Sequence, residues 1–117
     1  MTRRSPTQAR GDVAEERALA FLVGEGLSLV ERNVASRLGE IDLVMRDAGG
    51  IVFVEVRSRS RSDFGGAAAS VNAGKRRRLQ REAQRWMIRR FGDRWPPCRF
   101  DVCAFEGSHI DWIRGAF

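Results

Sequence analysis

The sequence predicts an α/β domain in which helices flank a mixed five-stranded sheet, in the order αβββαββ. Two segments, near residues 7–23 and 72–91, carry apolar side chains at helical spacing. Residues 38–58 alternate apolar and polar side chains on both sides of a turn signal, as a β-hairpin does. With 117 residues the chain is expected to form one domain, 1–117, that has a core of its own.

The first predicted helix runs from about Thr7 to Val23, and Gly24 and Gly26 are stop signals after it. Residues 1–10 are basic, and we expect them to form a flexible N-terminus. The segment Leu27–Val34 follows as the first strand. The apolar side of the helix is expected to comprise Val13, Ala14, Ala18, Phe21 and Leu22.

The hairpin supplies the second and third strands, and a polar, glycine-bearing loop, Ser58–Val71, leads to the second helix. Asn72 is the expected N-cap of that helix, which ends near Phe91. Strands at Arg99–Phe105 and His109–Ile113 complete the sheet. The expected core stripe of the helix is Leu79, Ala83, Trp86, Met87 and Phe91.

The hairpin places two acidic residues together. If Arg46 pairs with Ile51 across the turn, antiparallel counting puts Asp42 opposite Glu55. Residues at such positions share a face, with Cβ atoms about 4.5 to 5.5 Å apart. Two like charges this close destabilise a sheet unless a cation lies between them, and carboxylate oxygens are typical ligands of a divalent ion such as Mg²⁺ or Mn²⁺.

The alternative is that both carboxylates lie on an ordinary solvent-exposed face. The third strand is apolar on both faces near its start, since Ile51 and Phe53 alternate with Val52 and Val54. Such a strand is expected to be central and covered, so that a carboxylate on it needs a partner. A slip of one residue in the register would separate Asp42 from Glu55 and remove the site.

The net charge of +6 favours a polyanionic partner, with nucleic acid ahead of a membrane surface. No run of apolar residues approaches the length of a spanning helix, and none near the N-terminus has the length of a signal-peptide core. We therefore expect a cytoplasmic protein without a membrane partner. Cys98 and Cys103 fit no zinc or redox spacing, and are expected to be unpaired thiols in a reduced compartment.

The second helix carries a run of basic residues around its apolar stripe. A charge run is usually a solvated face, but like charges three or four residues apart repel one another, and here almost no acid offsets them. A nucleic-acid backbone would relieve this repulsion. Nothing in the run indicates base-specific contacts, so recognition is expected to depend on shape and phosphate. The expected nucleic-acid-binding residues are Arg59, Arg61, Lys75, Arg76, Arg77, Arg78, Arg81 and Arg85.

The acid on one strand, followed by a Glu-x-Lys-like pattern on the next, resembles the PD-(D/E)XK nuclease core. The likeness to the small bacterial YraN-like family extends from about Gly11 to Phe117. It is carried by the stretches GDVAEERALAFLVGEG, ERNVASRLGEIDLV and VFVEVRSRS, by Phe64-Gly65, and by VNAGK, RFDV and the closing GAF. Members of that family are described as predicted endonucleases distantly related to Holliday-junction resolvases, which implies a restriction-endonuclease-like fold.

The resemblance implies a catalytic set of Glu15, Asp42, Glu55 and Arg57, in which the three acids bind the metal. Arg57 stands where the family pattern has Lys, and an arginine stays protonated, so it cannot act as a general base. It can still hold a phosphate by its charge. The implied reaction is metal-dependent endonucleolytic hydrolysis of phosphodiester bonds in branched or structured DNA. A junction substrate would favour a two-fold homodimer.

Two other functions remain open on the sequence. Arg57 favours a non-catalytic nucleic-acid-binding module that keeps the nuclease-like fold. The net positive charge equally fits a ribosome-associated or RNA-binding accessory domain.

Overall fold

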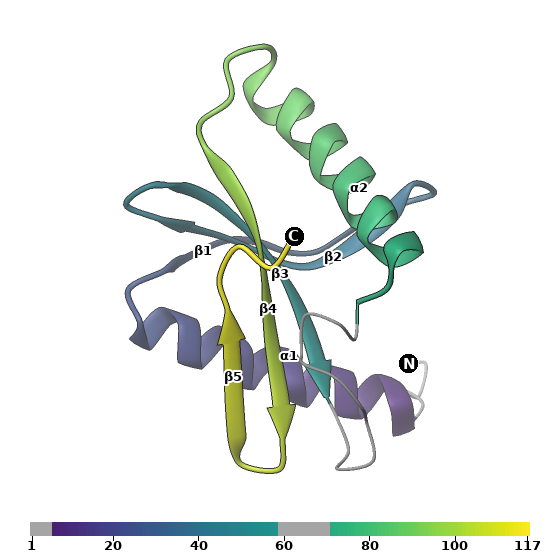
Figure 1. Cartoon of the computed structure of the whole chain (residues 1–117), viewed down its shortest axis with the longest axis vertical. Helices are drawn as coiled ribbons and strands as arrows, with labels where there is room; N and C mark the ends of the chain where they lie inside the picture. The colour runs from purple at the N-terminus through teal and green to yellow at the C-terminus, as the bar shows by residue number, and fades with distance from the viewer. Residues whose placement is uncertain (1–5, 59–70) are drawn as a thin grey trace, which may run out of the picture.

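The computed structural model describes residues 6–58 and 71–117. The elements lie in the predicted order αβββαββ (Figure 1). The predicted ends of each element lie within about two residues of the observed ones, which is the usual scatter of element boundaries. The elements are α1 (Pro6–Gly24), β1 (Ser28–Ser36), β2 (Gly39–Asp47), β3 (Gly50–Ser58), α2 (Ala73–Phe91), β4 (Cys98–Glu106) and β5 (His109–Ile113).

The five strands form one mixed sheet in the order β1-β2-β3-β4-β5. Neighbouring strands are antiparallel except β3 and β4, which are parallel. Parallel neighbours need a long crossover connection, and α2 lies within it. Strand β3 is central, and most of its side chains are buried on both faces, as its two-sided apolar pattern predicts.

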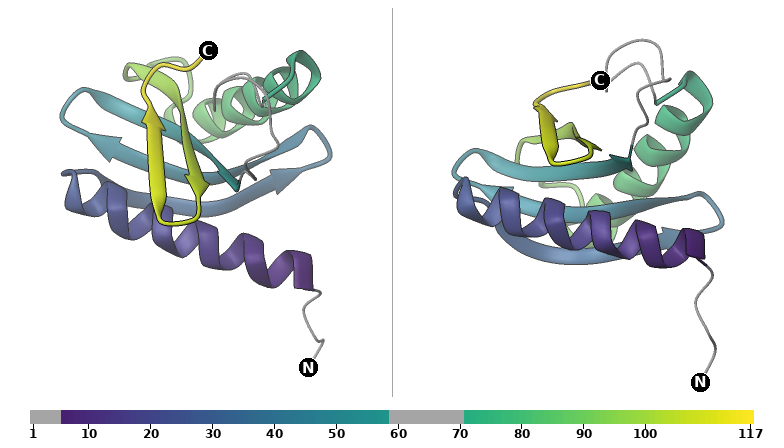
Figure 2. Two further views of the ribbon diagram at one scale, coloured as in Figure 1. Left: turned by 60° about the horizontal axis from the view of Figure 1, so that its bottom comes forward. Right: turned by 90° about the horizontal axis from the view of Figure 1, so that it is seen from below.

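Helix α1 covers one face of the sheet and α2 covers the other (Figure 2). Ala14, Ala18 and Leu22 are buried against the sheet. Val13, which we expected on the same apolar side, is 60% exposed, so that expectation is wrong. The buried residues Ala14, Ala18 and Leu22 are four residues apart and share one side of the helix. Val13 precedes Ala14 by one position, so its side chain is turned by about 100° around the helix axis.

The second helix begins and packs as predicted. Asn72 is its N-cap, and its side chain accepts a hydrogen bond of 2.9 Å from the backbone N–H of Lys75. The stripe predicted for the core is buried apart from Phe91, which packs at its margin. The predicted stripe omitted Glu82, which is fully buried and accepts hydrogen bonds from Ser36 and Arg85.

The turn between β2 and β3 sets the register of the hairpin. Arg46 pairs with Ile51, as predicted. Asp47 Oδ1 accepts hydrogen bonds from the backbone N–H groups of Gly49 at 2.8 Å and Gly50 at 3.0 Å. Gly50 has a φ of 146°, a backbone conformation that residues other than glycine rarely adopt. The predicted register is therefore confirmed.

Cys98 and Cys103 are free thiols, as expected, and they lie at the start and in the middle of β4. Among the residues that the structure describes, no helix is long and apolar enough to cross a membrane. Helix α1 begins at Pro6, inside the segment 1–10 that we expected to be a flexible arm. The predicted loop Ser58–Val71 lies outside the described residues except for its two ends.

Candidate functional site

Asp42 and Glu55 meet where β2 and β3 lie side by side, and Glu55 also contacts Lys75 of α2. The regular pairing of β2 with β3 runs from Asp47 and Gly50 to Leu43 and Val54, and Asp42 and Glu55 are the next residues along the two strands. Asp42 Oδ2 accepts a hydrogen bond of 2.8 Å from the backbone N–H of Val56. Glu55 is only 4% exposed. The chain thus holds two carboxyl groups together in a mostly buried place, as the hairpin pattern predicts.

This arrangement perturbs Asp42 strongly. Burial, and next the negative charge of Glu55, raise the pKa of Asp42 from its ordinary value of 3.8 to about 8, although the hydrogen bond from Val56 opposes the rise. This shift favours the protonated form of Asp42, which forms a side-chain hydrogen bond with Glu55. Carboxyl groups whose pKa is shifted this far by burial and a like charge are typical of functional sites.

Glu15, on α1, is the third carboxyl group of the cluster. Burial is the largest cause of its raised pKa; the charge of Arg32 opposes the rise, and the charges of Glu40 and Glu55 add to it. Its Oε1 atom is buried and has no hydrogen-bond partner among the described residues. A buried oxygen without a partner is costly, and this one is free to accept a hydrogen bond or to coordinate a cation.

Two cationic side chains lie beside Glu55. Lys75 Nζ is 2.7 Å from Glu55 Oε1, and Arg57 Nη1 is 3.9 Å from the same oxygen. Lys75 belongs to the first turn of α2, and the Asn72 cap fixes its backbone there. The closest positive charge to the acidic pair thus comes from the helix and not from β3.

Lys75 makes a contact that the sequence interpretation did not foresee. We expected it among the residues that contact nucleic acid along the helix, and its ammonium group also forms an ion pair with buried Glu55. One signal was available, because Lys75 is the only lysine among 21 basic residues. The resemblance to Glu-x-Lys directed attention to position 57, and no local pattern connects position 75 with Glu55.

The three acids suit a divalent cation by the chemistry of their donors. Among residues 6–58 and 71–117, no group of three or more His, Cys, Asp or Glu side chains is arranged so that it could hold a metal ion. Mg²⁺, however, usually keeps several waters and is bound by only one or two carboxylates together with substrate phosphates. Asp42 and Glu55 meet that requirement, and the unpartnered oxygen of Glu15 is a further acceptor nearby.

Two basic side chains of α2 also make structural contacts within the protein. Arg76 Nε donates to the carbonyl of Val71 at 2.9 Å, and its guanidinium lies over the ring of Phe117. Arg85 Nε donates to buried Glu82 at 2.9 Å. Both residues therefore have structural contacts that the sequence did not indicate. The other predicted contacts on this helix, Arg77, Arg78 and Arg81, are exposed. The predicted contacts Arg59 and Arg61 lie outside the described residues.

Comparison with known proteins places the chain among bacterial relatives of similar length. The chain is 53% identical over 111 residues to a UPF0102 protein of Dechloromonas aromatica, an alignment that covers 95% of this chain and 90% of the relative. It is 53% identical over 116 residues to a UPF0102 protein of Halorhodospira halophila, covering 99% of this chain and 92% of the relative. The model of the family described as "Uncharacterised protein family UPF0102" matches residues 14–105. The chain therefore belongs to the UPF0102 family, which is the YraN-like family that its motifs resemble.

Proposed function

We propose that the protein is a metal-dependent endonuclease that hydrolyses phosphodiester bonds in branched or structured DNA. The observation that carries this proposal is the contact between half-buried Asp42 and buried Glu55, two carboxyl groups on neighbouring strands. Like charges in such a place are unfavourable, and a bound Mg²⁺ or Mn²⁺ would offset them. Asp42 and Glu55 would hold the cation, and Glu15 would complete the site through a water molecule.

A bound divalent cation supplies a nucleophilic water and neutralises charge on the phosphate. The contribution of the chain itself comes from the two cations beside Glu55. Lys75 supplies from α2 the ammonium group that the Glu-x-Lys pattern has on the strand, and Arg57 adds a second fixed positive charge. Neither needs to lose a proton for this role, because fixed cations near the phosphate stabilise the charge that develops in the transition state.

The exposed arginines Arg77, Arg78 and Arg81 follow Lys75 along the same helix and would bind the backbone of the substrate. Contacts of this kind position a duplex without reading its sequence. Recognition of a branched substrate would then depend on shape. A two-fold homodimer would place two such sites on a four-way junction. The proposal includes a cytoplasmic location.

A cleavage assay tests the proposal. Pure protein is incubated with labelled junction, flap, single-stranded and duplex DNA, in Mn²⁺, Mg²⁺ or EDTA. We expect product from a branched substrate only with metal, and none from the Glu55→Gln variant. Glu25→Gln is the matched control, because Glu25 is an exposed acid directly after α1. Cleavage that persists in EDTA, or that Glu55→Gln retains, would overturn the proposal.

The second candidate is a nucleic-acid-binding module without turnover. The ion pair between Glu55 and Lys75 favours it, because this pair compensates one carboxylate without any metal. The arginine at position 57 favours it as well. In that case the same assay gives tight binding and no product with any metal.

A further inference from the structure

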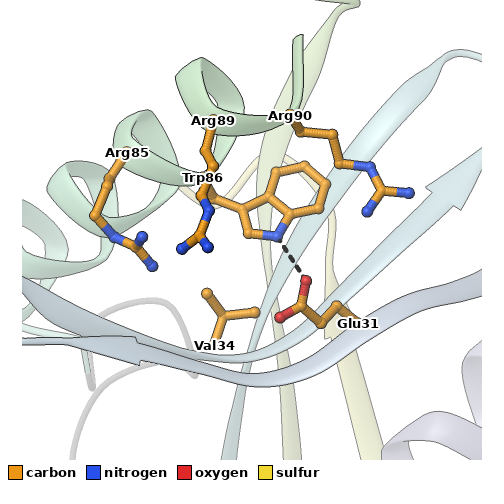
Figure 3. Close-up of a pocket in the computed structure, with 6 residues that line it drawn as sticks. All are labelled: Glu31, Val34, Arg85, Trp86, Arg89 and Arg90. Atoms are coloured by element: carbon orange, nitrogen blue, oxygen red, sulfur yellow. Dashed lines mark hydrogen bonds between the residues drawn. The ribbon is translucent and has the colours of Figure 1, made fainter. Parts of the chain in front are cut away.

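The helix α2 and the edge strand β1 enclose a pocket at the opposite end of the helix from Lys75. Its volume is about 390 Å³. Figure 3 shows the guanidinium groups of Arg85 and Arg89 on one side of the Trp86 indole and that of Arg90 on the other. All three extend from α2 toward β1. The residues that line the pocket are Glu31, Val34, Arg85, Trp86, Arg89 and Arg90.

The positive charges of this pocket are incompletely compensated. Arg89 has no hydrogen-bond or ion-pair partner in the part of the chain that the structure describes. Arg90 lies over the indole of Trp86, 5.3 Å from the ring centroid. Arg85 binds Glu82 through Nε and Nη2, and a guanidinium has five N–H donors, so others remain for a ligand.

The one carboxylate that lines the pocket holds the indole of Trp86 in place. Glu31 Oε1 accepts a hydrogen bond of 3.0 Å from Trp86 Nε1 (Figure 3). This bond fixes the position of the indole between the guanidinium groups of Arg89 and Arg90. Even when the buried Glu82 is included, three guanidinium groups face two carboxylates, and arginines four residues apart on a helix repel one another. An anion in the pocket would remove that repulsion.

We propose that this pocket binds a phosphate group of the DNA backbone, so that α2 contacts the substrate at both of its ends. The inference rests on the proposed function only in naming DNA as the source of the phosphate. Planar guanidinium groups match phosphate geometry with paired N–H donors, which favours phosphate over a smaller anion. Lys75 and Arg89 are fourteen residues apart on one helix, which corresponds to about 21 Å along its axis. On one strand of duplex DNA that span is about six base pairs.

An alternative, purely structural role for Arg89 and Arg90 is to complement the helix dipole at the carboxyl end of α2. That role predicts a loss of stability on mutation and no effect on DNA. The two roles therefore differ in a binding measurement.

The test is the affinity for a labelled DNA duplex of about two helical turns, measured by fluorescence anisotropy in EDTA between about 50 and 200 mM salt. For Arg89→Gln we expect weaker binding and a slope of log K against log salt that is smaller by about 0.9, the value for one lost phosphate contact. Arg89→Lys should keep the slope, because it keeps the charge. The matched control is Arg17→Gln, since Arg17 lies on α1 at the opposite face of the sheet, over the ring of Phe105.

An unchanged slope for Arg89→Gln would overturn the proposal. A second arm uses inorganic phosphate, added in place of chloride at equal ionic strength during thermal unfolding. If phosphate stabilises the wild type through Arg89 and the DNA slope stays unchanged, the pocket takes a free phosphate and the DNA assignment is wrong. Because EDTA removes any metal-dependent cleavage, the outcome is independent of whether the protein is a nuclease.

Discussion

Replacing Asp42 by Asn should stabilise the metal-free protein at neutral and alkaline pH. The change removes a carboxyl group whose pKa is raised from 3.8 to about 8 by burial and by the charge of Glu55. The amide oxygen of asparagine can still accept the hydrogen bond that the backbone N–H of Val56 now donates to Asp42. The substitution therefore removes a group that can ionise and keeps the local geometry.

The sign and size follow from proton linkage. A carboxyl group with a raised pKa favours folding below its ordinary pKa of 3.8, and this advantage is lost as the pH rises toward 8, because the folded state must then bury the charge. At 1.36 kcal/mol for each pKa unit, the full difference is at most about 5 to 6 kcal/mol above pH 8. Local relaxation and entry of water reduce that cost. We expect Asp42→Asn to gain about 2 to 3 kcal/mol near pH 8 and almost nothing near pH 4.

The assay is urea unfolding in EDTA at several pH values, with the free energy of unfolding of the variant compared with that of the wild type. Asp47→Asn is a control of opposite sign. Arg99 and the turn N–H groups lower the pKa of Asp47, so that variant should lose stability at neutral pH and recover it in acid. A stability difference between Asp42→Asn and the wild type that does not vary with pH would refute the reasoning.

The remaining predictions concern the cations and the packing of α2. Arg57→Lys should retain cleavage, whereas Lys75→Ala should lower it by about 10² to 10³-fold, the scale for removing one charge-stabilising donor, as single-turnover rates would show. Joint replacement of Arg77, Arg78 and Arg81 by Gln should reduce the slope of log K for DNA binding against log salt by about 0.9 per lost phosphate contact. The melting temperature should stay nearly unchanged. Gly39→Ala should lose about 1 to 3 kcal/mol in urea unfolding, because a Cβ there would overlap the backbone carbonyl of Arg78.

The acidic pair could be predicted because local chemistry determines it. Asp47 and the glycines after it set the turn, and the turn sets the register. Alternation along β3 then fixes the face on which Glu55 lies. The helix pattern likewise predicts which side of α2 is buried, since side chains three or four residues apart share one side of a helix.

The contacts that sequence reasoning missed depend on how distant elements dock. Lys75 reaches Glu55 only because α2 packs across the hairpin, and Gly39 lies against the backbone of the helix at that crossing. Glu82 has the sequence signature of a surface acid, but Ser36 on β1 and Arg85 on α2 supply its hydrogen bonds inside the core. Burial raises its pKa, and those hydrogen bonds outweigh the effect, so that the pKa is lowered overall.

The most direct test of the central claim, that the Asp42 and Glu55 pair binds a divalent cation, is the thermal unfolding of wild type and Asp42→Asn during a titration with Mn²⁺. A ligand bound only by the folded state, at a concentration of about 100 times its dissociation constant, adds about 2.7 kcal/mol of stability. We expect Mn²⁺ to raise the melting temperature of the wild type, and more so near pH 8 than near pH 6, because the cation must displace the proton on Asp42. We expect no rise for Asp42→Asn and an undiminished rise for Asp111→Asn, which changes an acid on β5. Equal shifts of wild type and Asp42→Asn would contradict the claim.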